Sequence, residues 1–319
     1  MNYLISAVLL FLMIYETGMA QDNRVQIANL NDGAQTEAFQ SIRQAFQNRN
    51  PGYEMDWLPE VREIGTREVT QVLFVQQIDG VTNQDVVTNV TITTAEGSRK
   101  ESEAIVGDIL ILNAGERLQT SSETGLLVFQ VPVAPEDELP HFIRPDWDPN
   151  ITDVPGGCAT EIDAYRRILL TWQEDVGEYI YHALNAHRVR IYDSFSHYHP
   201  VAGGFDEFYL VQLTVPGARI ITSEKVDLIT RPDEVVAGDL EGMIREYELN
   251  VGDLVYLPRG VMHRGVDGVV TQVITVPGFI PGSEIGVDHH LRSINERLGL
   301  DGEDALPYNE EHSHEAVIR

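Results

Sequence analysis

Short runs of aliphatic and β-branched residues, separated by turn residues, recur along most of the chain. In the first half these runs occupy residues 69–78, 86–94, 105–112 and 126–131. In the second half they occupy residues 164–172, 179–184, 189–195, 207–214, 246–249, 254–257 and 269–276. Short strands at regular intervals are typical of sandwiches and barrels and do not fit alternating βαβ units. The pattern therefore predicts the all-β fold class, with two β-rich halves.

Two segments instead carry apolar residues at helical spacing. Residues 36–46 predict a short helix that packs against the first half, and residues 291–298 predict a second helix. We expect the acidic tail after the second helix to be flexible. A proline-dense stretch between the halves marks a linker. The predicted organisation is an N-terminal arm with a helix (21–52), a first β-domain (53–135), the linker (136–159), a second β-domain (160–282) and the C-terminal helix with its tail (283–319).

The first twenty residues have the pattern of a signal peptide. An apolar run at positions 4–15 is followed by small residues that include Gly18 and Ala20. The run is shorter than the roughly 20 apolar residues that a membrane-spanning helix needs. We therefore expect residues 1–20 to be a signal peptide and the protein to be secreted or periplasmic.

Charge and cysteine content narrow the classes of function. The formal net charge is −28 and the isoelectric point is about 4.5. So acidic a surface repels phosphate backbones and anionic lipids, which argues against nucleic-acid and membrane partners. It also opposes anionic substrates unless a metal ion or a buried arginine reverses the field locally. A single cysteine, Cys158, excludes an internal disulfide framework and any site built from several thiolates.

The two β-rich halves share a weak internal repeat. Residues 106–115 (VGDILILNAG) and 251–260 (VGDLVYLPRG) place Val, Gly, Asp and a later Gly at the same offsets. A tandem duplication of one β-domain is the simplest interpretation.

Three histidines and a carboxylate in the second half form a candidate metal site. His197 and His199 are two residues apart in a strand-like run, so both imidazoles can face the same side. Glu207 opens the next strand, and His263 ends a later β-run. Asp206 is adjacent to Glu207 and is an alternative carboxylate. Such a nitrogen and oxygen set suits Fe, Mn, Ni, Cu or Zn.

The spacing around the last histidine resembles the second motif of the cupin superfamily. That motif is Gly, five residues, Pro, one residue, Gly, two residues, His, three residues and Asn. Gly252, Pro258, Gly260 and His263 match, and Asp267 stands where the family has Asn. The first cupin motif, His-x-His followed by Glu, matches the earlier pair, with seven residues instead of three or four before the glutamate.

The resemblance implies two tandem cupin barrels, of the jelly-roll kind, with short flanking helices. It implies a functional metal site in the second barrel only, with the metal bound by His197, His199, Glu207 and His263. The first half has no histidine before His141, and Leu118 stands where His263 would. One divalent metal per chain is expected, with Fe first and Cu, Ni, Mn or Zn as alternatives.

The resemblance further implies an enzyme acting on a small molecule. The leading hypothesis is a secreted dioxygenase that acts on an enolic or aromatic substrate. By analogy with the family, Glu207 would also accept a proton from a bound hydroxyl group. The alternatives are a redox-neutral lyase, isomerase or decarboxylase acting on a sugar or organic acid, and a bicupin that binds a metal or ligand without turnover. Phe195, Tyr209 and Met262 are candidates to line the substrate pocket. Cupins often pair through sheet edges, so a homodimer is also expected.

Overall fold

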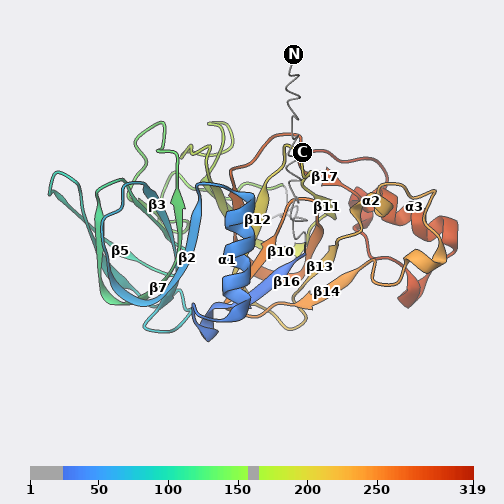
Figure 1. Cartoon of the computed structure of the whole chain (residues 1–319), viewed down its shortest axis with the longest axis horizontal. Helices are drawn as coiled ribbons and strands as arrows, with labels where there is room; N and C mark the ends of the chain where they lie inside the picture. Colours follow the sequence, from blue (N-terminus) through green and yellow to red (C-terminus); the bar gives the residue numbers. More distant parts are fainter. Residues whose placement is uncertain (1–23, 157–164) are drawn as a thin grey trace, which may run out of the picture.

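The computed structural model describes residues 24–156 and 165–319, which form two β-sheets side by side with few helices (Figure 1). The expected signal peptide and Cys158 lie outside the described residues. The sheets account for most of the regular structure, so the predicted all-β class with short flanking helices is confirmed.

The first sheet has seven strands. Its order is β5-β4-β7-β3-β6-β8, and β2 pairs with β7. The strands are β2 (Glu54–Ile64), β3 (Thr70–Ile78), β4 (Thr88–Thr93), β5 (Arg99–Ala104), β6 (Ile109–Leu112), β7 (Arg117–Val131) and β8 (Phe142–Ile143). Strand β8 lies within the expected linker, 136–159, and pairs with β6. This part of the proline-rich stretch therefore extends the first sheet.

The second sheet has ten strands around a central path, β1-β15-β12-β16-β10-β9. Strands β11 and β13 also pair with β16, β14 pairs with β13, and β17 pairs with β11. The strands are β1 (Gln26–Asn29), β9 (Arg166–Leu170), β10 (Asn185–Asp193), β11 (His197–Tyr198), β12 (Asp206–Thr214), β13 (Arg219–Ser223), β14 (Arg245–Glu248), β15 (Asp253–Leu257), β16 (Met262–Val276) and β17 (Ile285–Gly286). Strand β1 comes from the N-terminal arm, which therefore reaches across to the second half.

The internal repeat has a structural counterpart in the pairing of strands. In the first sheet β3 pairs with β6 and β7, and in the second β12 pairs with β15 and β16. Gly107 and Gly252 both have positive φ, 105° and 95°. Each is followed by an aspartate whose carboxylate accepts from the backbone N–H three residues earlier: Asp108 from Ile105 at 3.0 Å and Asp253 from Asn250 at 2.7 Å. The shared Val-Gly-Asp sequence thus builds the same turn in both halves.

Helix α1 (Glu37–Arg49) packs between the two sheets and contacts both. The Phe46 ring meets Phe129 of the first sheet at 5.7 Å and Phe208 of the second at 5.3 Å, edge to face in each case. The expected packing of this helix against the first half is confirmed, and the helix packs against the second half as well. Its apolar stripe is wide enough to close the seam between the sheets.

Several local predictions differ from the structure. Strand β5 was not predicted because its sequence, RKESEA, is charged, as befits the exposed edge of a sheet. No strand spans residues 179–184. The run 191–199 is not one strand, because β10 ends at Asp193 and β11 begins at His197.

The C-terminal part is ordered where we expected flexibility. Helix α3 (Asp288–Leu298) packs its apolar side in a cluster outside the second sheet, together with α2 (Val226–Ile229). The tail then returns to the sheet, where Ile318 pairs with Ile285. Backbone hydrogen bonds with Glu284 and with Gly286 of β17 hold the tail despite its acidic composition. In the described part of the chain, no helix combines the length and apolar character needed to cross a membrane.

Candidate metal centre

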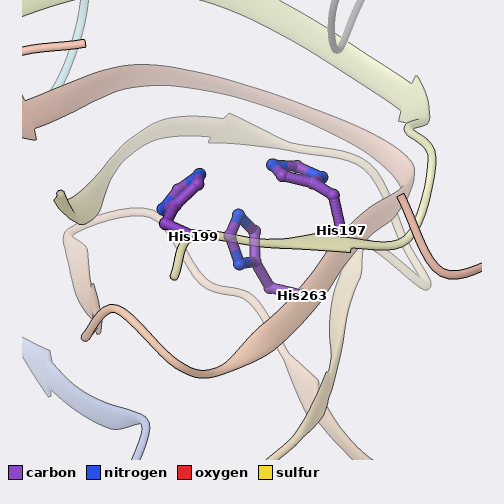
Figure 2. A group of neighbouring side chains, drawn as sticks. All are labelled: His197, His199 and His263. Carbon is purple, nitrogen blue, oxygen red and sulfur yellow. The ribbon is translucent and has the colours of Figure 1, made fainter. Parts of the chain in front are cut away.

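The three predicted histidine ligands converge at one point (Figure 2). One ring nitrogen each from His197, His199 and His263 lies within 4.8 Å of the other two. Each of the three residues is 1% exposed. The backbone enforces this convergence, because His197 pairs directly with His263 between β11 and β16, and the carbonyl of His199 accepts from Gly260 at 2.7 Å.

A sharp bend in β16 brings the carboxylate to the same point. Glu207 on β12 pairs with Thr275, which is twelve residues beyond His263 on β16. A straight strand would place those two positions roughly 40 Å apart. Yet Glu207 Oε1 lies 3.2 Å from His263 Nε2, and Oε2 lies 3.8 Å from His199 Nε2.

The bend explains the one mismatch in the second motif. Asp267 and Gly268 both have left-handed backbones, with φ of 65° and 93°, where β16 changes partners. Asn and Asp are the non-glycine residues that adopt this conformation most readily. Asp267 therefore serves the bend as well as the expected Asn would.

The unsatisfied atoms of the site match the donor set of a divalent metal ion. Nδ1 of His197 lies 3.1 Å from the carbonyl of Phe195, and Nδ1 of His263 lies 3.3 Å from that of Val261. These contacts leave Nε2 to face the site. Among the described residues, the Nε2 atoms of all three histidines and Oε1 of Glu207 are buried without a hydrogen-bond partner. Buried polar atoms rarely stay unpaired, so the residues fit a bound metal.

The electrostatics of the site also suit a metal. Burial lowers the pKa of His197 to about 4, helped by the neighbouring His263, and burial lowers that of His263 to about 4 as well. Both imidazoles are therefore neutral near pH 7, which is the ligand form. Burial raises the pKa of Glu207 to about 7, because it disfavours the charged carboxylate. A cation bound beside the carboxylate would stabilise that charged form.

Asp206, the alternative carboxylate, faces away from the histidines. Its Oδ1 accepts from the backbone N and the Nε of Arg259, both at 2.9 Å. Its Oδ2 accepts from Asn50 at 2.7 Å and from Tyr256 at 2.9 Å. Adjacent residues on a strand point to opposite faces, so only Glu207 can face the histidines.

A second carboxylate near the site was missed by the sequence reasoning. Glu284 Oε1 lies 4.0 Å from His197 Nε2. It directly precedes β17, whose pairing with β11 holds it there. Burial raises the pKa of Glu284. No sequence signal identifies this residue, because it lies in a loop outside both motifs.

A cavity of about 300 Å³ lies beside the metal centre and touches it through Glu207. Its lining includes Glu207 and Glu284 together with two arginines, Arg166 and Arg319. The charges of both arginines act on Glu284. The lining is completed by Ile168, Leu170, Trp172, Gln173, Asn185, Ala186, His187, Thr275, Phe279 and Pro281. The cavity is thus a mixed apolar and charged space that reaches one candidate ligand, Glu207.

Of the three residues expected in the substrate pocket, Phe195 and Tyr209 lie against ligand histidines, and none of the three belongs to the cavity lining. The Phe195 ring stacks on His197, with centroids 4.3 Å apart. Tyr209 lies in the apolar interior of the second sheet, with its ring edge-on to His263 at 6.3 Å. Met262 instead packs outside the sheet in the α3 cluster, because neighbours on a strand face opposite sides.

The corresponding positions of the first sheet carry no such ligands. Leu118 is the second residue of β7, as His263 is the second of β16, and it pairs with Ile64 where His263 pairs with His197. Gln71 pairs with Leu112 and Gln130, as Glu207 pairs with Leu257 and Thr275. Ile64 and Leu118 belong instead to the apolar interior. Within residues 24–156 and 165–319, the three histidines form the one His, Cys, Asp or Glu group that could hold a metal ion.

Comparisons with known proteins give a distant structural similarity. No family model matches the sequence, and no curated protein matches it. An oxalate decarboxylase studied for its substrate binding mode is similar at 14% identity and a TM-score of 0.45, over 88% of this chain and 80% of that chain. A Bacillus subtilis oxalate decarboxylase with Mn(II) centres is similar at 13% identity and a TM-score of 0.44, over 92% of this chain and 84% of that chain. The Lactobacillus farciminis oxalate decarboxylase formate complex is similar at 15% identity and a TM-score of 0.42, over 81% of this chain and 87% of that chain. These values report a similarity and do not place the chain in a family.

Proposed function

We propose that the protein is a metal-dependent enzyme that acts on a small organic acid, by redox-neutral cleavage of the decarboxylase or lyase type. The single observation that carries the proposal is the cavity. It reaches Glu207, the carboxylate that lies against three histidines with unsatisfied ligand atoms, and two arginines line it. This is the alternative raised by the sequence, preferred here over the dioxygenase.

The arginines favour an anionic substrate. The chain as a whole is strongly acidic and repels anions, and the two guanidinium groups in the cavity counter this repulsion locally. Guanidinium groups match carboxylates in shape and charge. A neutral enolic or aromatic substrate would gain less from them than a carboxylate, and this is the physical reason for preferring an acid.

The carboxyl of Glu284 supplies the acid–base group. A bound transition metal would be held by His197, His199, His263 and Glu207, and it would act as a Lewis acid on a substrate oxygen. When a carboxylate leaves as CO2, the carbon that carried it takes up one proton. Glu284 has a raised pKa and faces the cavity, so it is placed to give that proton.

The first experiment combines metal analysis with two gas measurements. Purified protein loaded with Mn or Fe is incubated with oxalate and pyruvate under anaerobic and aerobic conditions. The proposal expects stoichiometric metal and CO2 release that needs no net O2 consumption. Glu284→Gln should keep the metal and lose turnover, whereas His263→Ala should lose both.

Two results would contradict the proposal. Net O2 consumption in proportion to product would favour the dioxygenase hypothesis instead. If wild-type protein binds no metal after reconstitution, the hypothesis of a metal-dependent enzyme is rejected.

A further inference from the structure

The cavity beside the metal centre has an apolar wall on one side. The rings of Trp172 and Phe279 are stacked there, with centroids 4.0 Å apart and planes 26° from parallel. Ile168, Leu170 and Pro281 extend the same wall. The acid–base and metal chemistry described above uses none of these side chains.

Polar side chains cross the floor of the cavity on three adjacent strands. Thr275 on β16 pairs with Glu207 on one side and with Asn185 on the other. His187 is two residues beyond Asn185 on β10, so it faces the same side. Opposite residues on neighbouring strands have their Cβ atoms about 5 Å apart, so Thr275 and His187 lie progressively farther from Glu207.

Several polar atoms around this cavity lack partners. Thr275 is 4% exposed, and its Oγ1 has no hydrogen-bond partner among the described residues. Among the described residues, the buried Nε2 of His187 and the buried Nε1 of Trp172 also have no hydrogen-bond partner. Unpaired buried groups carry a desolvation cost of about 1–3 kcal/mol each. Three of them around one cavity indicate that a ligand with oxygen atoms normally completes them.

The size of the cavity indicates how large that ligand is. About 300 Å³ corresponds to roughly ten water molecules at liquid density. A two-carbon diacid such as oxalate has only six non-hydrogen atoms and would leave the aromatic wall uncovered. Covering the wall is favourable only for a ligand with an apolar body of its own.

We propose that the cavity is a two-part substrate subsite for an organic acid that carries a ring or a similarly bulky apolar group. Thr275 and His187 hydrogen-bond the oxygens of the acid near the metal centre, and Trp172 with Phe279 covers its apolar body. This inference rests on the proposed function and narrows its substrate class.

Two probes with a common head group test the inference. Pyruvate and phenylpyruvate share the 2-oxo acid and differ by a phenyl ring. Their affinities for the metal-loaded protein are measured by isothermal titration calorimetry. The wild type should bind phenylpyruvate at least tenfold more tightly, because a buried phenyl group contributes at least that much.

Three variants separate the two parts of the subsite. Trp172→Ala should remove most of the preference for phenylpyruvate, and Phe279→Leu should reduce it. Trp147→Ala is the matched control, because Trp147 is 46% exposed and lies outside the cavity lining. Thr275→Val keeps the side-chain shape and should weaken both probes by about threefold to tenfold while the preference for the ring stays. Metal content and thermal unfolding of each variant show that it is folded.

The outcomes distinguish the subsite from the function. Equal affinity for the two probes in the wild type, or an unchanged ring preference in folded Trp172→Ala and Phe279→Leu, would overturn the subsite and leave the proposed function standing. Binding of neither probe by metal-loaded wild type would overturn the organic-acid function and the subsite with it.

Discussion

The carboxylate of Asp206 accepts hydrogen bonds from both the backbone N and the side-chain Nε of Arg259, each at 2.9 Å. Asp206 immediately precedes the candidate ligand Glu207, and Arg259 lies in the turn that leads to His263. Arg49 at the end of α1 also approaches Asp206, at 3.4 Å. This cluster, Asp206 with Arg259 and Arg49, ties two ligand-bearing segments to the N-terminal helix.

Replacement of Asp206 by Asn should therefore destabilise the protein and weaken metal binding. Removing one partner of a buried ion pair leaves uncompensated charge, and the free energy of unfolding should fall by about 3 kcal/mol. Urea unfolding and metal titration measure the two effects. Asp267→Asn is the control, because its ion pair with Arg219 is half exposed and should contribute less than about 1 kcal/mol. Equal effects of the two substitutions would contradict a special role for the cluster.

Removal of one imidazole should abolish the metal centre. His263→Ala should lower the metal content from about one ion per chain to near zero. A metal at a hundred times its dissociation constant stabilises the fold by about 2.7 kcal/mol, so a chelator should lower the unfolding temperature of the wild type but not of His263→Ala. Elemental analysis and thermal unfolding measure these effects. His182→Ala, which alters an exposed imidazole, should behave like the wild type.

Metal affinity should fall as the pH is lowered from 8 to 5. Without metal, burial raises the pKa of Glu207 to about 7, so below that pH the carboxyl holds a proton that the metal must displace. Displacement of one proton weakens binding about tenfold per pH unit. The pKa values of His197 and His263 are lowered to about 4, so these two groups add further proton competition only near that pH. A flat affinity profile between pH 8 and 5.5, measured by competition with a chelator, would contradict a metal ligand with this raised pKa.

The turn glycine Gly252 should tolerate no side chain. Its φ is 95°, and a Cβ would lie 2.5 Å from Nδ2 of Asn31, which hydrogen-bonds the carbonyl of Val251. Gly252→Ala should combine backbone strain of about 1–3 kcal/mol with displacement of Asn31. Gly97 has a φ of 85° but open space around it, so Gly97→Ala isolates the strain alone. Urea unfolding should show a larger loss for Gly252→Ala, and equal losses would mean that the contact with Asn31 contributes nothing.

Much of the fold followed from the sequence, and the failures have physical causes. Strands with apolar cores, such as β3 and β12, were predicted because their burial demands hydrophobic side chains. Strand β5 was not, because an edge strand faces water and its charged sequence resembles a loop. The order of the C-terminal tail was missed because backbone hydrogen bonds to β17 hold it, and these leave no trace in composition.

The candidate site divides in the same way. The identities and spacing of His197, His199, Glu207 and His263 were visible because metal ligands need particular side chains at particular intervals. The choice of Glu207 over Asp206 agrees with the geometry, since strand alternation sends the two carboxylates to opposite faces. Glu284, Arg166 and Arg319 come from segments without a motif and meet only across the cavity.

The sequence by itself determined the all-β class, the duplicated Val-Gly-Asp turn and the set of candidate ligands, because strand periodicity and ligand chemistry are local properties. Only the tertiary structure decided that β16 bends at Asp267 and Gly268, that α1 fills the seam between the sheets, and that arginines and aromatic rings share one cavity with Glu207. These features depend on contacts between residues far apart in the chain. Each is fixed by packing and hydrogen bonding that no local pattern encodes.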